Sequence, residues 1–360
     1  MKSLNQLIIT LMACLFSIQA WAQSGKLFNT DNQLSSNLAT QVFQDKSGFI
    51  WIATRNGLNT YDGYHIIVMK KDMSNFLGLK SNYINSIAQD DKEHILLGTN
   101  NSLLEFTGSE FHKIPMLDSK GEELATYVKQ VYPLKNKDVA VATSGYGIMI
   151  KKKDAQECHA MKGEVEKLKY IHKLLEDKRG RLWIITEDGK LYRKETNGRV
   201  TSHFVGTEGV DAQDIQQDVL GNLYLASKNQ GVHLLRAGSN VFTRISSIGN
   251  LPIENIYISR NNKLYIGCDG LGIYVYDPQT GFLQDNPLFS RLVNLAKSKV
   301  TSIIEDNQGN IWVSMLQKGV FMQSNIQNDF NYMGFRLGSR NVIGENCVTS
   351  LSINQGNQVW

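Results

Sequence analysis

The sequence predicts an all-β fold, a seven-bladed β-propeller of four-stranded antiparallel blades followed by the start of a second propeller. Three observations lead to this fold class. An apolar hexapeptide recurs at intervals of 41 to 48 residues, each copy follows a short strand and a tight polar turn, and further short strands come after it. Four short strands in each repeat of this length are typical of propeller blades. A long β-sandwich would have no reason to keep one period over seven units.

The first 22 residues are expected to be a signal peptide. Lys2 gives a positive start, Leu7 to Ile18 is an apolar run, and Ala20-Trp21-Ala22 resembles a cleavage site. The run is too short to span a bilayer. Lipoprotein processing before Cys14 and an uncleaved signal anchor remain open as alternatives. Export predicts a periplasmic location.

The composition argues for a fold held by core packing. The formal net charge is +4 and 42% of the residues are hydrophobic, which supplies a core but no strongly basic surface. Once Cys14 is removed, Cys158, Cys268 and Cys347 remain, far apart and without C-x-x-C spacing. They predict neither a disulfide framework nor a zinc site. We expect no cofactor, no metal and no nucleic acid partner.

The first element of each repeat is an alternating strand that ends in a tight turn. The turn often reads Asp-x-x-Gly, as in Asp45–Gly48 and Asp177–Gly180, which suits a type I turn. One aspartate per repeat at this position indicates turn chemistry rather than a carboxylate pair for acid–base catalysis. The first strands are expected at 42–45, 84–90, 128–134, 171–177, 215–218, 256–259 and 300–306.

The second element is the apolar hexapeptide. Both faces of a propeller blade pack on neighbouring blades, so apolar residues are expected on both faces of this strand. Trp51, Trp183 and Trp312 lie in the middle of these strands, and we expect them in the core rather than on a sugar-binding surface. The second strands are expected at 50–53, 95–98, 139–142, 182–185, 223–226, 264–267 and 311–314.

A polar loop with glycine leads to a third strand, and a fourth short strand usually completes the repeat. The seventh repeat has only three strands before a new segment begins near Phe330. An open ring would leave an unpaired strand edge. We therefore expect residues 26–29 to fill the outer position of blade seven and to pair with residues 320–323.

The segment after the seventh repeat is expected to begin a second ring. Residues 330–350 parallel residues 26–41, and Trp360 is an eighth anchor position. The sequence is therefore expected to be part of a longer protein. The expected domains are a signal peptide at 1–22, a seven-bladed propeller at 23–329 and a truncated second propeller at 330–360.

Three repeats carry a specific resemblance. They read VFQDKSGFIWIATRNGLNTYDG, LLEDKRGRLWIITEDGKLYR and IIEDNQGNIWVSMLQKGVFM. These segments resemble the two-component-regulator propeller repeat of the periplasmic half of large, often hybrid sensor histidine kinases from Bacteroidetes-type bacteria. The resemblance runs from about Lys26 to Trp360. It is weakest in the third repeat, where Ala140 replaces the tryptophan and Asn136-Lys137 replaces the Asp-x-x-Gly turn.

This resemblance implies a receptor much larger than the chain. Such receptors carry two propellers, an immunoglobulin-like domain, one membrane helix and a cytoplasmic histidine kinase. It therefore implies a second propeller and downstream domains as partners, a homodimer, and an inner-membrane anchor for the complete protein. It also implies that the ligand is a glycan or a glycan fragment.

The sequence itself offers no catalytic constellation. The seven histidines have no H-x-x-x-H or H-E-x-x-H spacing, and no glycine pair is followed by the Gly-Lys-Ser/Thr of a phosphate loop. His172 is interpreted as a strand residue before the Asp177 turn. The only possible nucleus of an enzyme site is Tyr146, Glu187, Asp188 and Asp269. No histidine joins these residues in the loops.

The loops between the second and third strands are the candidate binding site. Propeller geometry brings their tips to one face around the central axis, and binding residues often come from loops. The tips are polar and amide-rich with one aromatic ring, which suits sugar hydroxyls and the C–H face of a sugar. An ordinary polar surface without a ligand is the alternative. The candidate residues are Arg55, Asn56, Asn100, Asn101, Tyr146, Glu187, Asp188, Lys228, Asn229, Asp269, Gln317 and Lys318.

The predicted function is a non-catalytic, extracytoplasmic recognition module of a two-component receptor. Its predicted ligand is an oligosaccharide or a similar small molecule. Two alternatives remain open: a secreted propeller enzyme of the polysaccharide lyase or hydrolase type, and a stand-alone glycan-binding or adhesion propeller. The sequence beyond Trp360 would separate the receptor from the stand-alone propeller.

Overall fold

A computed structural model describes residues 25–325 except 72–77, 204–209, 286–287 and 289–293, together with Ser350. Residues 25–325 form one compact unit. The expected signal peptide lies outside the described residues, as does the expected second ring apart from Ser350. No helix within the described part reaches the length and apolarity that a membrane span requires.

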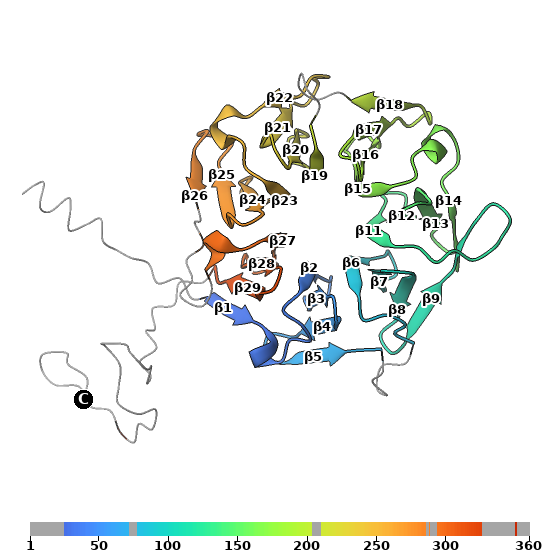
Figure 1. The fold of residues 1–360 in the computed structure, drawn as a ribbon, viewed down its shortest axis with the longest axis horizontal. Coiled ribbons are helices and arrows are strands. Elements are labelled where there is room, and N and C mark those ends of the chain that lie inside the picture. The colour runs from blue at the N-terminus through green and yellow to red at the C-terminus, as the bar shows by residue number, and fades with distance from the viewer. Residues whose placement is uncertain are drawn as a thin grey trace, which may run out of the picture. The chain divides into compact units, whose positions relative to one another are not determined.

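Seven sheets stand around a central axis, which confirms the predicted seven-bladed propeller (Figure 1). Blade 1 contains β2 (Ala39–Gln44), β3 (Ile50–Thr54), β4 (Gly57–Tyr61) and β5 (Ile66–Met69). Blade 2 contains β6 (Ile84–Gln89), β7 (Ile95–Thr99), β8 (Leu103–Phe106) and β9 (Phe111–Ile114). Blade 3 contains β11 (Val128–Pro133), β12 (Val139–Thr143), β13 (Ile148–Lys151) and β14 (Cys158–Ala160).

The remaining blades follow the same order. Blade 4 contains β15 (Ile171–Glu176), β16 (Leu182–Thr186), β17 (Leu191–Lys194) and β18 (Val200–His203). Blade 5 contains β19 (Ala212–Gln217), β20 (Leu223–Ser227), β21 (Val232–Leu235) and β22 (Thr243–Arg244). Blade 6 contains β23 (Ile253–Ile258), β24 (Leu264–Cys268), β25 (Ile273–Tyr276) and β26 (Leu283–Asp285). Blade 7 contains β27 (Val300–Glu305), β28 (Ile311–Met315), β29 (Gly319–Gln323) and β1 (Gly25–Phe28).

Two details go beyond the regular four-stranded pattern. A fifth strand, β10 (Met116–Leu117), pairs in parallel with β14 at the outer edge of blade 3. In the described parts of the connections lie four short 3₁₀ helices, η1 (Thr30–Asn32), η2 (Glu164–Lys167), η3 (Ser246–Ile248) and η4 (Leu295–Lys297). The sequence periodicity gives no sign of either feature, because both lie between the repeated strands.

The ring is closed by its own amino-terminal strand. β1 pairs antiparallel with β29, so that Gly25 faces Gln323 and Phe28 faces Val320. This pairing matches the closure expected for residues 26–29. The Phe28 ring stacks on Trp312 with 5.3 Å between centroids and meets Tyr61 edge-on at 4.9 Å. The closing strand therefore joins the aromatic core of blade 7 to that of blade 1.

The hydrophobic core lies between blades rather than at the centre of the ring. The described core residues form seven clusters, and each cluster joins neighbouring blades. Trp51, Trp183 and Trp312 are 6%, 0% and 2% exposed, which confirms that they are core residues. Burial of apolar area between the blades, to which these rings contribute, stabilises a fold without a single central core.

The repeated aspartates close the turns and also hold the tryptophans. In blade 4, Asp177 Oδ1 accepts the backbone N–H groups of Arg179 and Arg181, while Oδ2 accepts the indole N–H of Trp183 at 2.9 Å. The same indole bond joins the Asp and Trp of blades 1 and 7 at 2.7 Å. The aspartate thus has the turn role predicted for it and, in addition, fixes the core tryptophan.

Candidate functional site

Each innermost strand carries a β-bulge at the same place. The pairing of the first strand with the second skips one residue near the start of every blade. The skipped residues are Thr40, Asn85, Lys129, His172, Gln213, Glu254 and Thr301. A bulge inserts an unpaired residue and re-aims its side chain. The first strands were predicted to alternate. They do not alternate at the bulge, because two polar residues lie side by side there between buried apolar ones.

The residue after each bulge fastens its blade to the next one. In five blades its side-chain oxygen accepts a backbone N–H from the innermost strand of the next blade. Examples are Gln41 accepting from Ile87 at 2.8 Å and Gln130 accepting from Leu174 at 2.6 Å. The five residues are Gln41, Ser86, Gln130, Asp214 and Ser302. This belt of hydrogen bonds holds the inner strands at a fixed spacing around the axis.

Lys173 and Asn255 occupy the same position in blades 4 and 6 but bond differently. A lysine has no acceptor. The ammonium group of Lys173 instead pairs with Asp214 of blade 5 at 3.2 Å. Asn255 donates its amide to the carbonyl of Val300 at 2.9 Å. The polar belt is thus continuous, but it carries charge only between blades 4 and 5.

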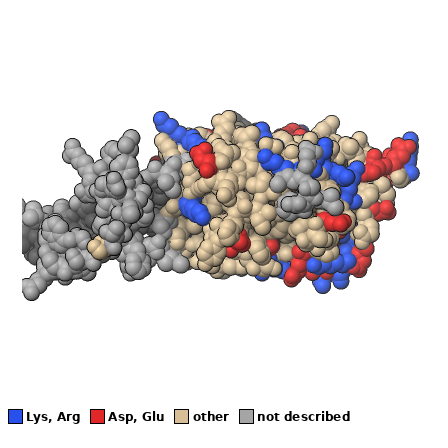
Figure 2. Space-filling model, turned by 90° about the horizontal axis from the view of Figure 1, so that it is seen from below, with Lys and Arg blue, Asp and Glu red and all other residues tan. Residues whose placement is uncertain are grey.

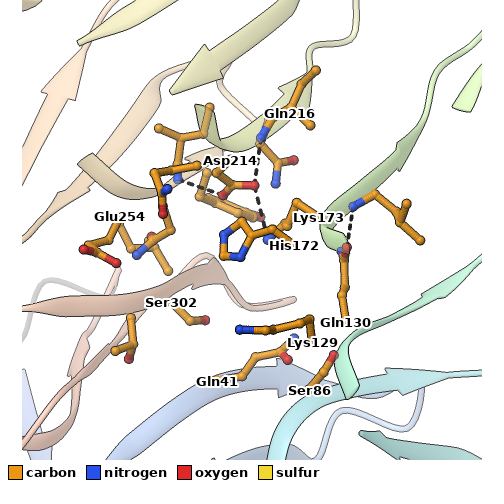
Figure 3. A pocket seen from close by; sticks show the side chains of 18 of the residues that line it. Gln41, Ser86, Lys129, Gln130, His172, Lys173, Asp214, Gln216, Glu254 and Ser302 are labelled. Atoms are coloured by element: carbon orange, nitrogen blue, oxygen red, sulfur yellow. Dashed lines mark hydrogen bonds and ion pairs between the residues drawn. The ribbon is translucent and has the colours of Figure 1, made fainter. Parts of the chain in front are cut away.

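The bulge residues and the belt line a central cavity of about 510 Å³ (Figure 3). On blades 1, 2 and 7 the bulge side chains Thr40, Asn85 and Thr301 donate hydrogen bonds to carbonyl groups of the following blade. On blades 3 to 6 the corresponding residues are Lys129, His172, Gln213 and Glu254. Figure 3 shows the Lys129 chain and the His172 ring extending into the space between the strands. The chemically varied part of the channel therefore belongs to blades 3 to 6.

A second hollow of about 600 Å³ forms the mouth of this channel. Four bulge residues line it together with loop residues from blades 4 to 6 and the residue before β27. Its lining consists of Lys129, His172, Glu187, Gln213, Lys228, Pro252, Glu254, Asp269 and Lys299. We refer to these nine residues as the channel mouth.

Ion pairs connect most of the charged groups at the channel mouth. Lys129 of blade 3 pairs with Glu187 of blade 4 at 3.4 Å. Lys299 pairs with Glu254 at 2.7 Å and with Asp269 at 2.8 Å. Burial lowers the pKa of Lys299, but the hydrogen bonds to Asp269 and Glu254 outweigh this effect and raise the pKa above its ordinary value. Lys299 therefore stays charged between two carboxylates.

His172 is neutral in this environment. Burial lowers its pKa, the neighbouring ammonium groups of Lys173, Lys129 and Lys228 add to the effect, and Asp214 opposes it. The resulting pKa is about 4. A neutral imidazole has one N–H donor and one acceptor. At neutral pH His172 can therefore both donate and accept a hydrogen bond in the channel mouth.

Aromatic rings and cations continue from the channel mouth around the same end of the ring. The guanidinium of Arg55 lies 5.4 Å from the Tyr83 ring centre, and the ammonium of Lys129 lies 4.9 Å from that of Tyr127. Tyr83 and Tyr127 meet edge-on at 6.2 Å, and the Tyr127 hydroxyl donates to the side chain of Asn85. This row runs from blade 1 to blade 3 and offers partly exposed ring faces beside the channel.

The loop tips lie at the end of the blades where the inner strands begin. Their backbone N–H groups bond to carbonyls just before the inner strands, as Arg55 does to Leu38 and Asp269 to Pro252. The structure brings Glu187, Lys228 and Asp269 together at the channel mouth. The other tip candidates do not line it. These are Arg55, Asn56, Asn100, Asn101, Tyr146, Asp188, Asn229, Gln317 and Lys318.

Several tip residues serve the loops themselves. The ammonium of Lys318 donates to the carbonyls of Asn294 and Lys297 and to the hydroxyl of Ser298. The carboxylate of Asp188 accepts from Thr186 and pairs with Lys190 at 2.7 Å. Tyr146 is 44% exposed and contributes a free ring at this end.

The sequence interpretation missed the bulge residues. His172 is a strand residue, as interpreted, and it does not come from a loop, but it lines the channel mouth together with Glu187 and Asp269. It was missed because only the loops were considered. A signal exists in the sequence, since each inner strand has two adjacent polar residues between two apolar ones, as in Ile171-His172-Lys173-Leu174. Such a pair breaks a strict alternation and is typical of a bulge.

Outside the channel, the described residues include one cluster of possible metal ligands. Ligand atoms of Asp90, His94 and Glu105 lie within 4.8 Å of one another in blade 2. The buried ammonium of Lys151 lies 3.8 Å from the Glu105 oxygen that also faces His94. A protein cation therefore already lies beside the cluster, which disfavours a metal ion there.

Comparison with known proteins identifies the repeat. Residues 33–56 and 294–317 match the two-component regulator propeller. The chain carries two-component regulator propeller repeats. These segments contain the first two strands of the first and seventh repeats, which are two of the three repeats whose sequences had suggested the resemblance. No curated protein matches the chain.

Solved structures share the fold of these propeller repeats. The extracellular domain of the putative hybrid two-component system BT3049 from B. thetaiotaomicron is 22% identical with a TM-score of 0.74, and the match covers 94% of this chain and 46% of that one. The extracellular domain of the putative one-component system BT4673 from the same organism is 15% identical with a TM-score of 0.71, over 95% and 45%. The chain thus spans about half the length of these two structures.

The fold is shared by enzymes as well. A virginiamycin B lyase from Staphylococcus aureus is 12% identical with a TM-score of 0.65, and the match covers 84% of this chain and 99% of that one. At this identity the likeness concerns the propeller architecture alone. The fold alone therefore does not indicate the function of this chain, and the residues of the channel mouth have to do so.

Proposed function

We propose that the chain is the extracytoplasmic recognition region of a two-component receptor and that it binds an oligosaccharide at the channel mouth. The repeat match and the likeness to extracellular domains of two-component systems support the receptor assignment. The coverage of about half of those domains fits a second propeller in the complete protein. In this proposal the complete receptor is a homodimer, is anchored in the inner membrane, and carries its kinase outside this chain.

The observation that carries the ligand assignment is the composition of the channel mouth. Its bulge residues are a lysine, an imidazole, an amide and a carboxylate, each from a different blade. Sugar hydroxyls need both donors and acceptors at several angles, and this set offers both. The Tyr83 and Tyr127 rings beside it suit the C–H face of a sugar. A ligand that contacts several blades at once would also act on the arrangement of those blades in the ring.

The proposal requires recognition without turnover. The purified chain should bind members of a panel of neutral and acidic oligosaccharides in calorimetry, with a saturable heat and no product. Glu254→Ala together with Gln213→Ala should weaken binding by about tenfold or more, because two hydrogen-bonding groups are lost. Lys46→Met, at the opposite end of the blades, should leave the affinity unchanged.

Three outcomes would contradict the proposal. Absence of binding to every oligosaccharide would remove the glycan assignment. Turnover of any of them would make the propeller an enzyme. Binding that survives the double substitution but is lost after combined replacement of Asn56 and Tyr146 would move the site from the channel mouth to the outer loops.

A further inference from the structure

We propose that the channel mouth selects oligosaccharides with an anionic group, a carboxylate or a sulfate, and that this group binds between Lys228 and His172. This inference rests on the proposed function and specifies the class of glycan. It follows from the distribution of charge between the two sides of the channel mouth.

Lys228 is the lysine of the channel mouth without an ion pair among the described residues. The other two lysines there, Lys129 and Lys299, are each held by carboxylates at 3.4 Å or less. The carboxylates of the two loops on either side of Lys228, Glu187 and Asp269, are the ones taken by those lysines. Lys228 therefore presents an exposed ammonium group into the hollow. Of the two neighbouring loop carboxylates, Glu187 pairs with Lys129, and Asp269 shares Lys299 with Glu254.

Positive charge gathers on the same side of the hollow. The ammonium groups of Lys129, Lys173 and Lys228 all act on the imidazole of His172. The opposing carboxylate, Asp214, is buried, pairs with Lys173 and accepts two backbone N–H groups, from Ile215 and Ile256. It has little capacity left to neutralise a further cation. An anion placed here gains charge-assisted hydrogen bonds, which are stronger than neutral ones.

The opposite side of the mouth suits hydroxyl groups. Glu254 and Asp269 share one ammonium group, that of Lys299. A carboxylate has two oxygens and about four acceptor positions, so both retain acceptor capacity after this pairing. An anionic group would be repelled from these two carboxylates. The ligand is therefore oriented, with its acidic group towards blades 4 and 5 and its hydroxyls towards blade 6.

The side of the ring seen in Figure 2 does not show a comparable bias. In the edge-on view of Figure 2, Lys and Arg side chains lie intermixed with Asp and Glu. A long polyanion that lies along the side of the ring would find no continuous basic path on the side shown. This favours a short acidic oligosaccharide that enters the mouth.

Matched ligand pairs test the inference on the purified chain. Galacturonic acid oligosaccharides would be compared with their methyl esters, and sulfated galactose oligosaccharides with the desulfated forms. At least one charged member is expected to bind about tenfold more tightly than its neutral partner, with a difference that shrinks as salt increases. Inorganic sulfate is expected to bind much more weakly, because it makes none of the hydroxyl contacts.

Substitutions locate the anionic group. Lys228→Met is expected to abolish the preference, so that the charged and the neutral member bind with about equal affinity, and Lys228→Arg is expected to retain the preference. Lys46→Met removes a surface lysine at the other end of the blades and should have no effect. His172→Gln keeps a donor and an acceptor and is expected to weaken charged ligands less than Lys228→Met does.

The results separate this inference from the proposed function. Equal or tighter binding of the neutral members would overturn the inference and leave oligosaccharide recognition in place. A preference that survives Lys228→Met would also overturn it. Binding of inorganic sulfate as tight as that of the oligosaccharides would show an anion site rather than a glycan site. Binding of no oligosaccharide at all would defeat both proposals.

Discussion

The two ends of the inner strands differ in how far their residues repeat from blade to blade. At the turn end, one chemistry is repeated: an aspartate accepts the backbone N–H four residues later in five of the seven blades. At the mouth end the seven bulge positions carry six residue types, and blades 3 to 6 all differ. The comparison shows that the residues at the turn end have the same structural role in most blades. The mouth end is where individual blades can differ without disturbing the ring.

The largest expected effect comes from removing the closing strand. Deletion of Gly25–Phe28 exposes the edge of β29 and removes Phe28 from its place against Trp312 and Tyr61. An unpaired edge strand favours aggregation. The deleted chain should therefore lose its cooperative unfolding transition and form large species in size-exclusion chromatography. Lys26→Ser, which keeps the backbone pairing, should remain monodisperse. A deleted chain that stays compact and cooperative would show that closure is dispensable.

The next largest effect is expected at the turn end of blade 4. Trp183→Ala removes a side chain with no exposed area and should lower the free energy of unfolding by about 3–5 kcal/mol. Trp51→Ala should act in the same range. Urea unfolding would measure both. An unchanged midpoint for either variant would mean that the tryptophan does not support the interface between blades.

A smaller effect is expected when the aspartate alone is changed. Burial raises the pKa of Asp177, but hydrogen bonds from Trp183 and Arg181 outweigh it and leave the pKa below its ordinary value. Its contribution to stability is therefore present above the pKa of an unfolded aspartate, about 3.9, and is lost as the pH falls through the lower folded value. Asp177→Asn should cost about 1–3 kcal/mol at pH 7.

The pH dependence tests the cause of that loss. The difference in stability between Asp177→Asn and the unchanged chain should narrow as the pH is lowered below about 4, because the aspartate loses its charge there. Denaturant midpoints at several pH values would show this convergence. A difference that stays constant down to the lowest pH would mean that the charge of Asp177 contributes nothing.

The smallest effects on stability are expected at the mouth end. Lys228→Met should change the free energy of unfolding by no more than about 0.5 kcal/mol, as is usual for exposed positions. The same variant should raise the pKa of His172 from about 4, since Lys228 is one of the cations that lower it. Nuclear magnetic resonance titration of the imidazole would measure this shift. A stability loss as large as that of Trp183→Ala would erase the distinction between the two ends.

The same distinction explains what the sequence could predict. The period, the turn aspartates and the core tryptophans repeat, so their places in seven blades followed from spacing and burial. Three of the channel-mouth residues, Glu187, Lys228 and Asp269, followed from the loop positions. The bulge residues did not, because they do not repeat in type and a search for apolar alternation passes over them. Ion pairs such as Lys129 with Glu187 join different blades and depend on the geometry of the closed ring.

The pairing of β1 with β29 also sets an order of events during biogenesis. A chain that is made and translocated from its amino terminus delivers β1 first and β29 about three hundred residues later. Until then blade 1 has no neighbour on one side and β1 has no strand to join. The propeller cannot reach its final state blade by blade. Its first segment must wait in an unpaired, aggregation-prone form, so the yield of folded protein should depend on chaperones that shield the early blades.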